Sequence, residues 1–262
     1  PTVLKENGYY NLFFMTHEGQ YDNMNAFFRT NGYDEVFSQE NYPADKVVNS
    51  FGVQDDFLYD YAIPVLNQRA ATGQPFFATL LSISNHPPYV IPPFFHPKTS
   101  EPETQIVEYA DWALRQFFEE ARKQPWFDNT IFVLEGDHGK LVGDAECELP
   151  ESYNHIPLMI YSSRIQPEEK TTFGGQVDIQ PTILGLLNID YLQNNFGVDL
   201  LKEERPCMFY TADNMVVGRN DTLLYLYNYE TQQELTYDIG NGKLNAVPMD
   251  DSFLPLKEYS FS

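Results

Sequence analysis

Four short runs of apolar residues recur along the first part of the chain. They cover Tyr10–Met15, Phe76–Ser82, Thr130–Leu134 and Pro157–Tyr161. Each run is rich in strand-forming residues and apolar on both faces, which is typical of parallel strands covered by helices. We therefore predict an α/β fold with a mostly parallel sheet and flanking helices.

Helical periodicity appears between these runs. Apolar residues from Ile106 to Ala121 recur at three- and four-residue spacing, and a second helix is predicted near Pro181 in VDIQPTILGLL. The stretch Asn85–Pro102 is rich in proline and has little periodicity, which predicts a long loop. Strands that alternate with helices in this way are typical of βαβ units.

The pattern changes from about Pro206 onward. Strand-forming residues are interrupted there by Gly218–Asp221 and by Glu230–Thr231, which indicates an antiparallel meander. We therefore predict two domains, an α/β core at residues 1–205 and a small antiparallel subdomain at residues 206–262 that packs on the core.

The charge balance restricts the partners. Among 262 residues, 16 Lys and Arg stand against 38 Asp and Glu, a formal net charge of −22, which argues against a nucleic-acid partner. An anionic substrate would need a local cation, such as a bound metal, to reverse this field. Cys147 and Cys207 match no four-ligand zinc spacing, and we expect them to be unpaired.

Histidines gather at the ends of the predicted strands. His17, His86 and His138 each follow a strand, His155 lies two residues before the last strand, and His96 stands apart. Ligands of open α/β sheets bind beyond the carboxyl ends of the strands. A single loop histidine is usually solvated or hydrogen-bonded to its neighbours, but three at equivalent positions favour a shared site.

The segment after the third strand combines a carboxylate with an imidazole. Asp137 and His138 offer a hard oxygen and a nitrogen, a common pairing for a divalent cation, and Gly136 and Gly139 permit a sharp turn. The alternative is that Asp-His-Gly only closes a strand. Glu135 faces the same side as Asp137 in strand geometry, either as a third ligand or as a buried structural carboxylate.

Longer segments carry a family resemblance. TIFVLEGDHG, NHIPLMIYSS and GGQVDIQPTILGLLNID are similar in order and spacing to the alkaline-phosphatase superfamily, and within it to sulfatases and lipoteichoic acid synthases. PFFATLLSISNHPPY and THEGQYDNMNAFFRTNGYDEVF resemble the family's preceding segments, and QQELTYDI resembles the closing motif of sulfatases. The resemblance covers essentially the whole chain and implies a bacterial ester-processing enzyme.

The resemblance also implies roles for individual residues. Asp137 and His138 would bind one divalent metal ion (Mn, Mg, Ca or Zn). His17 and His86 would contact the anionic group under attack, with His155 in a supporting role. A threonine or serine nucleophile, or formylglycine in true sulfatases, would attack phosphorus or sulfur while the metal lowers its pKa. The implied substrate is an anionic sulfate or phosphate ester, such as that of a glycolipid or glycan.

The sequence departs from the family pattern at two places, which bear on its activity and its substrate. The nucleophile and the first metal-binding acid of the family precede the segment matched by Pro1. We therefore expect an N-terminally truncated catalytic domain that is silent alone, with no strand beside one face of Tyr10–Met15. Met24 and Ala26 replace a tryptophan and an arginine that contact glycerol phosphate in the synthases. Polar neighbours suit sugar or polyol hydroxyls instead; these are Tyr21, Asp22, Asn23 and Asn25.

Three functions remain open from the sequence. The first is a metal-dependent sulfuric or phosphoric ester hydrolase or phosphoglycerol transferase. It would act on the extracytoplasmic face of the membrane or in the periplasm, with any membrane anchor outside this chain. The second is a non-catalytic binding module of the same fold. The third is a two-metal enzyme related to phosphoglycerate mutases or nucleotide pyrophosphatases, for which five histidines are a thin supply of ligands.

Overall fold

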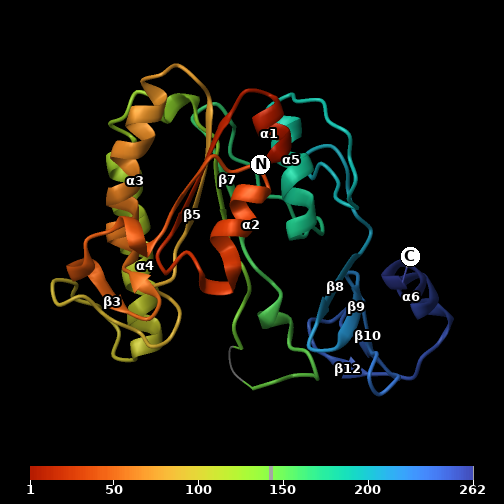
Figure 1. Ribbon diagram of the computed structural model, residues 1–262. Helices are drawn as coiled ribbons and strands as arrows, with labels where there is room; N and C mark the ends of the chain where they lie inside the picture. Colours follow the sequence, from red (N-terminus) through yellow and green to blue (C-terminus); the bar gives the residue numbers. More distant parts are fainter. Residues whose placement is uncertain (142–143, 262) are drawn as a thin grey trace. The chain divides into compact units, whose positions relative to one another are not determined.

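The computed structural model describes residues 1–141 and 144–261, and it forms two compact units, residues 1–130 and 131–262 (Figure 1). The predicted α/β class is confirmed, because the first unit holds a parallel sheet with flanking helices and the second holds an antiparallel sheet towards the C-terminus. The two units are described in turn.

The sheet of the first unit has β1 (Tyr10–Met15) at its centre. It pairs in parallel with β2 (Glu35–Phe37) on one side and with β5 (Phe76–Leu81) on the other. Five of the six residues of β1 are buried, the polar Asn11 among them, as is typical of a central strand covered on both faces. The expectation that one side of β1 lacks a strand is therefore wrong. The three residues of β2 are too few for a period to be recognised in the sequence.

Helices cover both faces of this sheet. On one face, α2 (Met24–Thr30) packs Phe28 against Phe13 of β1 with ring centroids 3.8 Å apart. Helices α3 (Asp55–Ala70) and α4 (Pro102–Ala121) pack against each other, and Figure 1 shows them on the opposite side of β5 from α2. The predicted helix is α4, whose buried residues recur at helical spacing: Ile106, Tyr109, Ala113, Phe117 and Ala121.

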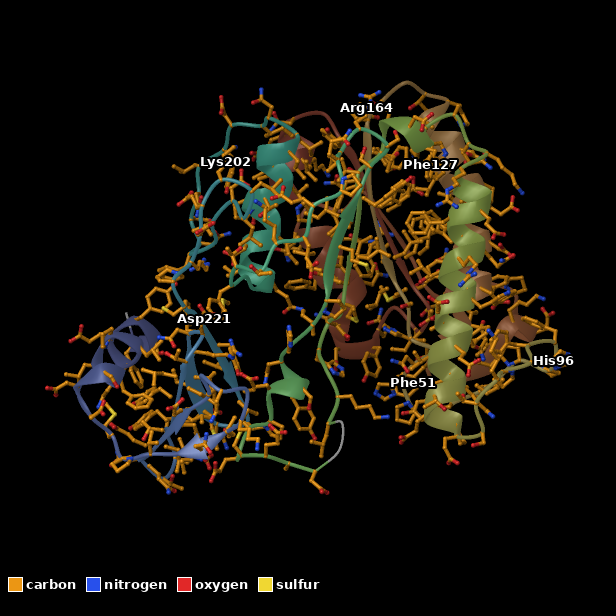
Figure 2. The ribbon with its side chains drawn as sticks, turned by 180° about the vertical axis from the view of Figure 1, so that it is seen from behind. Phe51, His96, Phe127, Arg164, Lys202 and Asp221 are labelled. Carbon is orange, nitrogen blue, oxygen red and sulfur yellow. The ribbon has the colours of Figure 1, made fainter. Side chains whose placement is uncertain are left out.

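Short elements complete the first unit. They are α1 (Thr2–Glu6) and a hairpin of β3 (Val47–Asn49) and β4 (Gly52–Val53). The predicted loop runs without helix or strand from the end of β5 to the start of α4. It carries His96, which Figure 2 shows at the outer side of α4.

The second unit begins with two paired strands, β6 (Phe132–Glu135) and β7 (Leu158–Tyr161). They were predicted as parallel strands, but they pair with each other in antiparallel register, with Glu135 opposite Leu158. The prediction failed on direction because periodicity reports how a strand is buried and not which way it runs. Helix α5 (Ile179–Leu186) follows, at the position predicted around Pro181.

The predicted antiparallel meander is confirmed. Its sheet has the order β12-β11-β10-β9-β8, with α6 (Leu254–Phe261) contacting β8 and β9. The strands are β8 (Met208–Ala212), β9 (Met215–Arg219), β10 (Leu223–Asn228), β11 (Gln233–Asp238) and β12 (Asn245–Ala246). Cys147 and Cys207 are free, as expected. No helix within residues 1–141 and 144–261 combines the length and hydropathy needed to cross a bilayer.

Candidate functional site

Two of the predicted site histidines lie at one edge of the first unit. His17 follows β1 and His86 follows β5, and the parallel register that places Met15 opposite Leu81 brings the two strand ends together. His17 is 2% exposed, whereas His86 is exposed. We call this pair the histidine edge. The parallel register therefore places the segments that carry His17 and His86 at the same edge of the sheet, where ligands of such sheets bind.

The backbone around His17 is held closely. Gly52 of the hairpin has φ +91°, and a Cβ there would lie 1.8 Å from the Thr16 carbonyl oxygen. Glu40 accepts hydrogen bonds from the Gly19 amide and from the Ser38 hydroxyl. Desolvation opposes these bonds, but together with the charge of His17 they lower the pKa of the Glu40 carboxyl. The turn after β1 is therefore fixed by both packing and hydrogen bonds.

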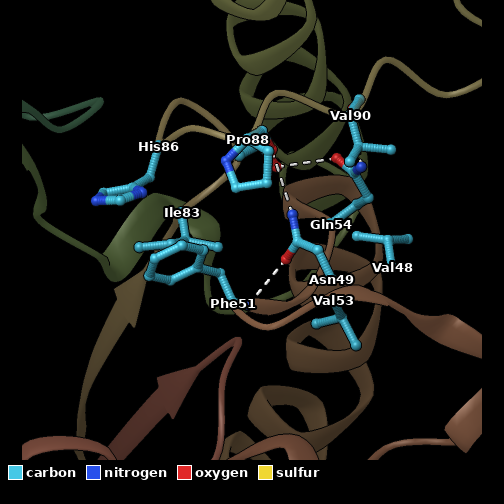
Figure 3. Close-up of a pocket in the computed structure, with 10 residues that line it drawn as sticks. Val48, Asn49, Phe51, Val53, Gln54, Ile83, His86, Pro88 and Val90 are labelled. Carbon is cyan, nitrogen blue, oxygen red and sulfur yellow. Dashed lines mark hydrogen bonds between the residues drawn. The ribbon is translucent and has the colours of Figure 1, made fainter.

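A buried carboxylate organises the approach to His86. Asp55, in the first turn of α3, accepts hydrogen bonds from the amides of Ile83 and Ser84 at 2.9 and 3.0 Å. The Ser84 hydroxyl in turn bonds to Gln54, which lines a small recess beside His86 (Figure 3). Burial raises the pKa of Asp55 despite these bonds. The segment that leads from β5 to His86 is therefore anchored to a helix terminus.

The second unit holds the other predicted residues in a turn that follows β6, which we call the Asp-His turn (Gly136–Gly139). The side chains of Asp137 and His138 are 75% and 72% exposed. The side chain of Gln176 supports the turn by donating to the backbone carbonyls of Gly136 and Asp137 at 3.2 and 2.9 Å. The functional groups are therefore open to solvent while the backbone that carries them is held.

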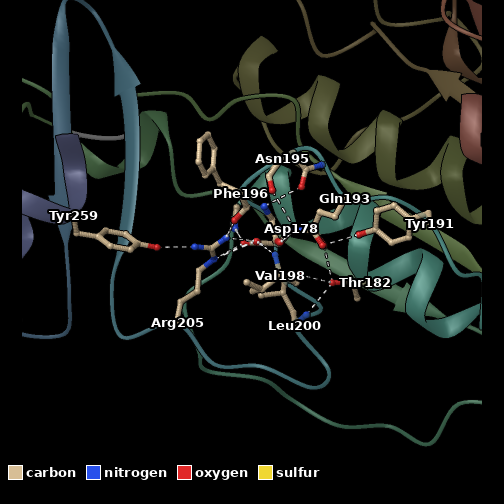
Figure 4. A network of polar contacts seen from close by, with 12 residues as sticks. Asp178, Thr182, Tyr191, Gln193, Asn195, Phe196, Val198, Leu200, Arg205 and Tyr259 are labelled. Atoms are coloured by element: carbon tan, nitrogen blue, oxygen red, sulfur yellow. Dashed lines mark hydrogen bonds and ion pairs between the residues drawn. The ribbon is translucent and has the colours of Figure 1, made fainter. Parts of the chain in front are cut away.

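A buried ion pair stands behind Gln176. Two residues further on, Asp178 is fully buried and is paired with Arg205 at 2.6 Å (Figure 4). The Arg205 guanidinium also donates to the Phe196 carbonyl and to the Tyr259 hydroxyl. Each charge in this network has a partner, which is the condition under which buried charges are tolerated.

The antiparallel pairing of β6 with β7 brings His155 to the same end of the strand pair. His155 precedes β7, and the start of β7 lies opposite the end of β6. The Gly139 amide donates to the Tyr153 carbonyl at 2.8 Å, and a Cβ on Gly139 would lie 1.9 Å from the Ser152 carbonyl oxygen. The segment before His155 is therefore packed directly on the Asp-His turn.

Three of the histidines share one hydrogen-bond arrangement. The Nδ1 atoms of His17, His86 and His138 lie 3.1, 2.7 and 2.8 Å from the backbone carbonyl oxygen of the following residue. A carbonyl oxygen only accepts, so each Nδ1 must carry the proton. Each ring therefore presents Nε2, as a lone pair when neutral and as a donor when protonated.

The Asp-His turn has the donor chemistry of a partial metal site. His138 Nε2 and Asp137 Oδ2 are 3.7 Å apart. Two ligands held at about 2.1 Å from one cation stand roughly 3 to 3.5 Å apart, so a small rotation would let both reach it. Partial desolvation and the charge of Asp137 raise the pKa of nearby Glu135. No group of three potential ligands occurs within residues 1–141 and 144–261, so the described residues provide two donors and not a full ligand shell.

Several supporting residues were not found from the sequence. Glu40, Asp55 and Gln176 act through backbone amides and carbonyls, and no short motif records such contacts. Tyr21 and Phe51 lie beside the two histidines of the histidine edge, with ring centroids 4.9 Å from His17 and 4.2 Å from His86. The sequence predicted Tyr21 only as part of a polar loop, and the structure shows in addition that its ring contacts His17.

Comparison with protein families gives a match along most of the chain. The sulfatase family model matches residues 1–189. Lipoteichoic acid synthase 1 of Bacillus subtilis is 27% identical over 94% of this chain and 40% of its own length. Phosphoglycerol transferase I of Xanthomonas campestris is 26% identical over 83% of this chain and 33% of its own length. The chain thus spans well under half the length of these relatives.

Solved structures show the same fold. A protein of the alkaline phosphatase superfamily from Vibrio parahaemolyticus superposes with a TM-score of 0.87 at 29% identity, over 99% of this chain and 65% of that one. The lipoteichoic acid synthase LtaP from Listeria monocytogenes superposes with a TM-score of 0.81 at 22% identity, over all of this chain and 71% of that one.

Proposed function

Because this chain belongs to the sulfatase family, we propose that it provides the anion-binding and metal-binding residues of an enzyme that cleaves or transfers a phosphoric or sulfuric ester. Relatives named as lipoteichoic acid synthase and phosphoglycerol transferase support a reaction of this kind. The observation that carries the proposal is the shared arrangement of His17, His86 and His138, each of which presents Nε2 from a strand end.

The proposed work of the histidine edge follows from its protonation. Because Nδ1 is committed to a backbone carbonyl, a neutral His17 or His86 offers only a lone pair, which does not bind an anionic oxygen. A protonated ring donates from Nε2 to a non-bridging oxygen and adds a positive charge to a strongly acidic protein. The proposed anion-binding form of this edge is therefore the one in which the rings carry both protons.

Asp137 and His138 are the residues proposed to hold a divalent cation, with His155 in a supporting position. Such a cation would neutralise charge on the substrate and activate a nucleophile. The Nδ1–H bond of His138 to the Gly139 carbonyl orients Nε2 for this role, as backbone acceptors commonly do for metal-bound histidines. The proposed location is the extracytoplasmic side of a membrane or the periplasm.

The test measures binding before turnover. Protein with isotope-labelled histidine side chains is titrated separately with inorganic phosphate, inorganic sulfate and Mn²⁺. The imidazole resonances are followed by NMR, as shifts for the anions and as line broadening for the paramagnetic ion. Phosphate or sulfate should perturb His17 and His86, and Mn²⁺ should broaden His138. Asp137→Asn should remove the Mn²⁺ response, and His86→Ala should weaken anion binding. Mn²⁺ broadening spread evenly over all five histidines, His96 included, would contradict the proposal.

Turnover separates an enzyme from a binding module of the same fold. Aryl phosphate and aryl sulfate esters are assayed with Mn²⁺, using protein that includes whatever sequence naturally adjoins residues 1–262. An enzyme should lose roughly 100-fold or more in kcat/KM on His86→Ala, a loss typical of removing one transition-state donor. Anion binding without turnover in that preparation would favour the binding module.

A further inference from the structure

The two histidines of the histidine edge are joined by a series of aromatic rings. Building on the proposed function, we propose that Tyr21 and Phe51 form the wall that binds the organic group of the ester. We further propose that this wall selects an uncharged group with a ring, an aryl group or a neutral sugar, over glycerol.

The rings form a continuous path. Tyr21 lies 4.9 Å from His17 and 6.4 Å from Phe51, and Phe51 lies 4.2 Å from His86, all between ring centroids. Tyr21 is 48% exposed although it covers a buried imidazole. A large aromatic face is therefore open to solvent between the two groups proposed to hold the anion.

Both rings are held in place by the backbone. The Phe51 amide donates to the Asn49 side chain, and Asn49 donates to the Pro88 carbonyl beyond His86 (Figure 3). Asp22 and Asn23, which follow Tyr21, have φ of +46° and +59°, a region that residues other than glycine seldom occupy. The backbone on both sides of the wall is therefore held in a defined conformation, which reduces the ordering that ligand binding requires.

Covalent connectivity decides what covers this wall. An ester whose phosphoryl or sulfuryl group contacts His17 and His86 must place its organic group within a few bonds of them, and the rings of Tyr21 and Phe51 lie there. The recess beside His86 has a volume of about 10 Å³, which is room for roughly one water molecule. A ring cannot enter that recess, and the exposed aromatic faces beside it are the surface that we propose for the ring.

The charges around the wall oppose a second negative group. Residues 17–41 contain five acidic residues and, besides His17, one base, Arg29; two of the acidic residues, Asp34 and Glu35, are paired with Lys5 and Arg69. Arg29 already donates to the Asn25 side chain and to the Asp34 carbonyl. An organic group with its own phosphate, sulfate or carboxylate would meet acidic side chains such as Glu18 and Asp22 without a free cation from this segment. The preferred group is therefore neutral, and flat enough to stack.

The experiment compares phosphonates that share one anionic group. Methylphosphonate, phenylphosphonate and 4-carboxyphenylphosphonate are titrated into the full chain, with affinity from calorimetry and the site from the His17 and His86 resonances. Phenylphosphonate should bind about three- to tenfold tighter than methylphosphonate, the range of a single aromatic contact. The carboxylated compound should lose that gain.

Substitutions assign the preference to the wall. Tyr21→Leu and Phe51→Leu should each lower the ratio of phenylphosphonate affinity to methylphosphonate affinity towards one. The affinity for methylphosphonate should stay within about twofold of that of the unsubstituted protein. Phe94→Leu, which removes an exposed ring that contacts Trp112, is the matched control and should change neither affinity. Tyr21 is exposed, so Tyr21→Leu is not expected to impair folding.

The three possible negative results have different meanings. Equal affinity for the methyl and phenyl compounds, with His17 and His86 responding to both, would overturn the aromatic wall and leave the proposed function intact. No response of His17 or His86 to any phosphonate would overturn both. A phenyl preference that survives both leucine variants would also contradict the wall.

Discussion

The histidine edge and the Asp-His turn present similar groups, but His17 is buried whereas Asp137 and His138 are exposed. At the histidine edge, support is immediate: a glycine pressed on the Thr16 carbonyl and a carboxylate bound to the next turn fix a buried His17. At the Asp-His turn, Asp137 and His138 project into solvent. The backbone of the turn is held by the contact of Gly139 with Ser152, by Gln176 and by the ion pair behind Gln176. A buried imidazole such as His17 suits the binding of an anion without rearrangement of the site. Exposed side chains such as Asp137 and His138 suit metal binding in which the side chains rotate to coordinate the ion.

The largest loss of stability is expected from breaking the buried ion pair behind the Asp-His turn. Arg205→Leu leaves the fully buried Asp178 without its partner, so it should lower the free energy of unfolding of the second unit by about 3 to 5 kcal/mol. Hydrogen exchange of α5 and of the Asp-His turn measures the loss.

Tryptophan fluorescence provides the internal control, since both tryptophans, Trp112 and Trp126, lie in the first unit. Their transition should not move in Arg205→Leu. Lys257→Leu, which breaks a partly exposed pair with Glu234, should cost no more than about 1 kcal/mol. An equal shift of the tryptophan transition would remove the distinction between the two supports.

Gly52→Ala tests the direct support of the histidine edge. The new Cβ would overlap the Thr16 carbonyl oxygen, and φ at this position is +91°, so we expect a loss of about 3 kcal/mol or more from the first unit. Urea unfolding followed by tryptophan fluorescence measures it. Gly73→Ala has a similar φ of +77° with open space around the Cβ, and it should cost only about 1 kcal/mol.

If Gly73→Ala proves as damaging as Gly52→Ala, backbone strain alone explains the loss. The contact with Thr16 would then carry no special weight, and the support of His17 would have to be sought elsewhere.

A smaller effect is expected from pH at Glu40. Its folded pKa is lowered, so its stabilisation is present above the unfolded pKa and is lost as pH falls through the folded pKa. Because the group is largely exposed, we expect less than about 1 kcal/mol. The Gly19 amide resonance, followed from neutral to acidic pH, should move with this titration and should stop moving in Glu40→Gln. If the Gly19 resonance still moves with pH in Glu40→Gln, the titration that it reports belongs to a group other than Glu40.

The smallest effect is expected at Thr16. Its hydroxyl is buried and has no hydrogen-bond partner among the residues that the structure describes. Thr16→Val removes an unpaired polar group with little change of shape, so stability should stay the same or rise by up to about 1 kcal/mol. Thermal unfolding measures the change. A clear loss of stability would reveal a bound partner, such as a water molecule, at the base of the histidine edge.

The sequence predicted the elements that are long and periodic. Strands β1 and β5, helices α4 and α5 and the C-terminal meander lie where apolar spacing placed them. It missed β2, whose three residues are too short to show a period, and it misassigned the relative direction of β6 and β7. Direction depends on how the chain between two strands is routed, and burial patterns do not encode that routing.

The candidate site divides in the same way. The histidines and the Asp-His turn were predicted because chemistry-bearing residues stand beside strand ends. Glu40, Asp55 and Gln176 were not, since their contacts join segments that are distant in sequence and use backbone groups common to every residue. The supporting role of His155 stays a prediction, and only the antiparallel pairing shows that this residue lies at the same end of the strand pair as the Asp-His turn.

The Nδ1 contacts of His17, His86 and His138 bear on how such a site can diversify. Each ring is oriented by the main-chain carbonyl of its own neighbour, a group that no side-chain substitution deletes. Mutation can therefore exchange the surrounding side chains, Tyr21 and Phe51 among them, while the tautomers of the three imidazoles stay the same. A lineage built on this frame is free to explore new ester partners by point mutation without first losing its reactive groups.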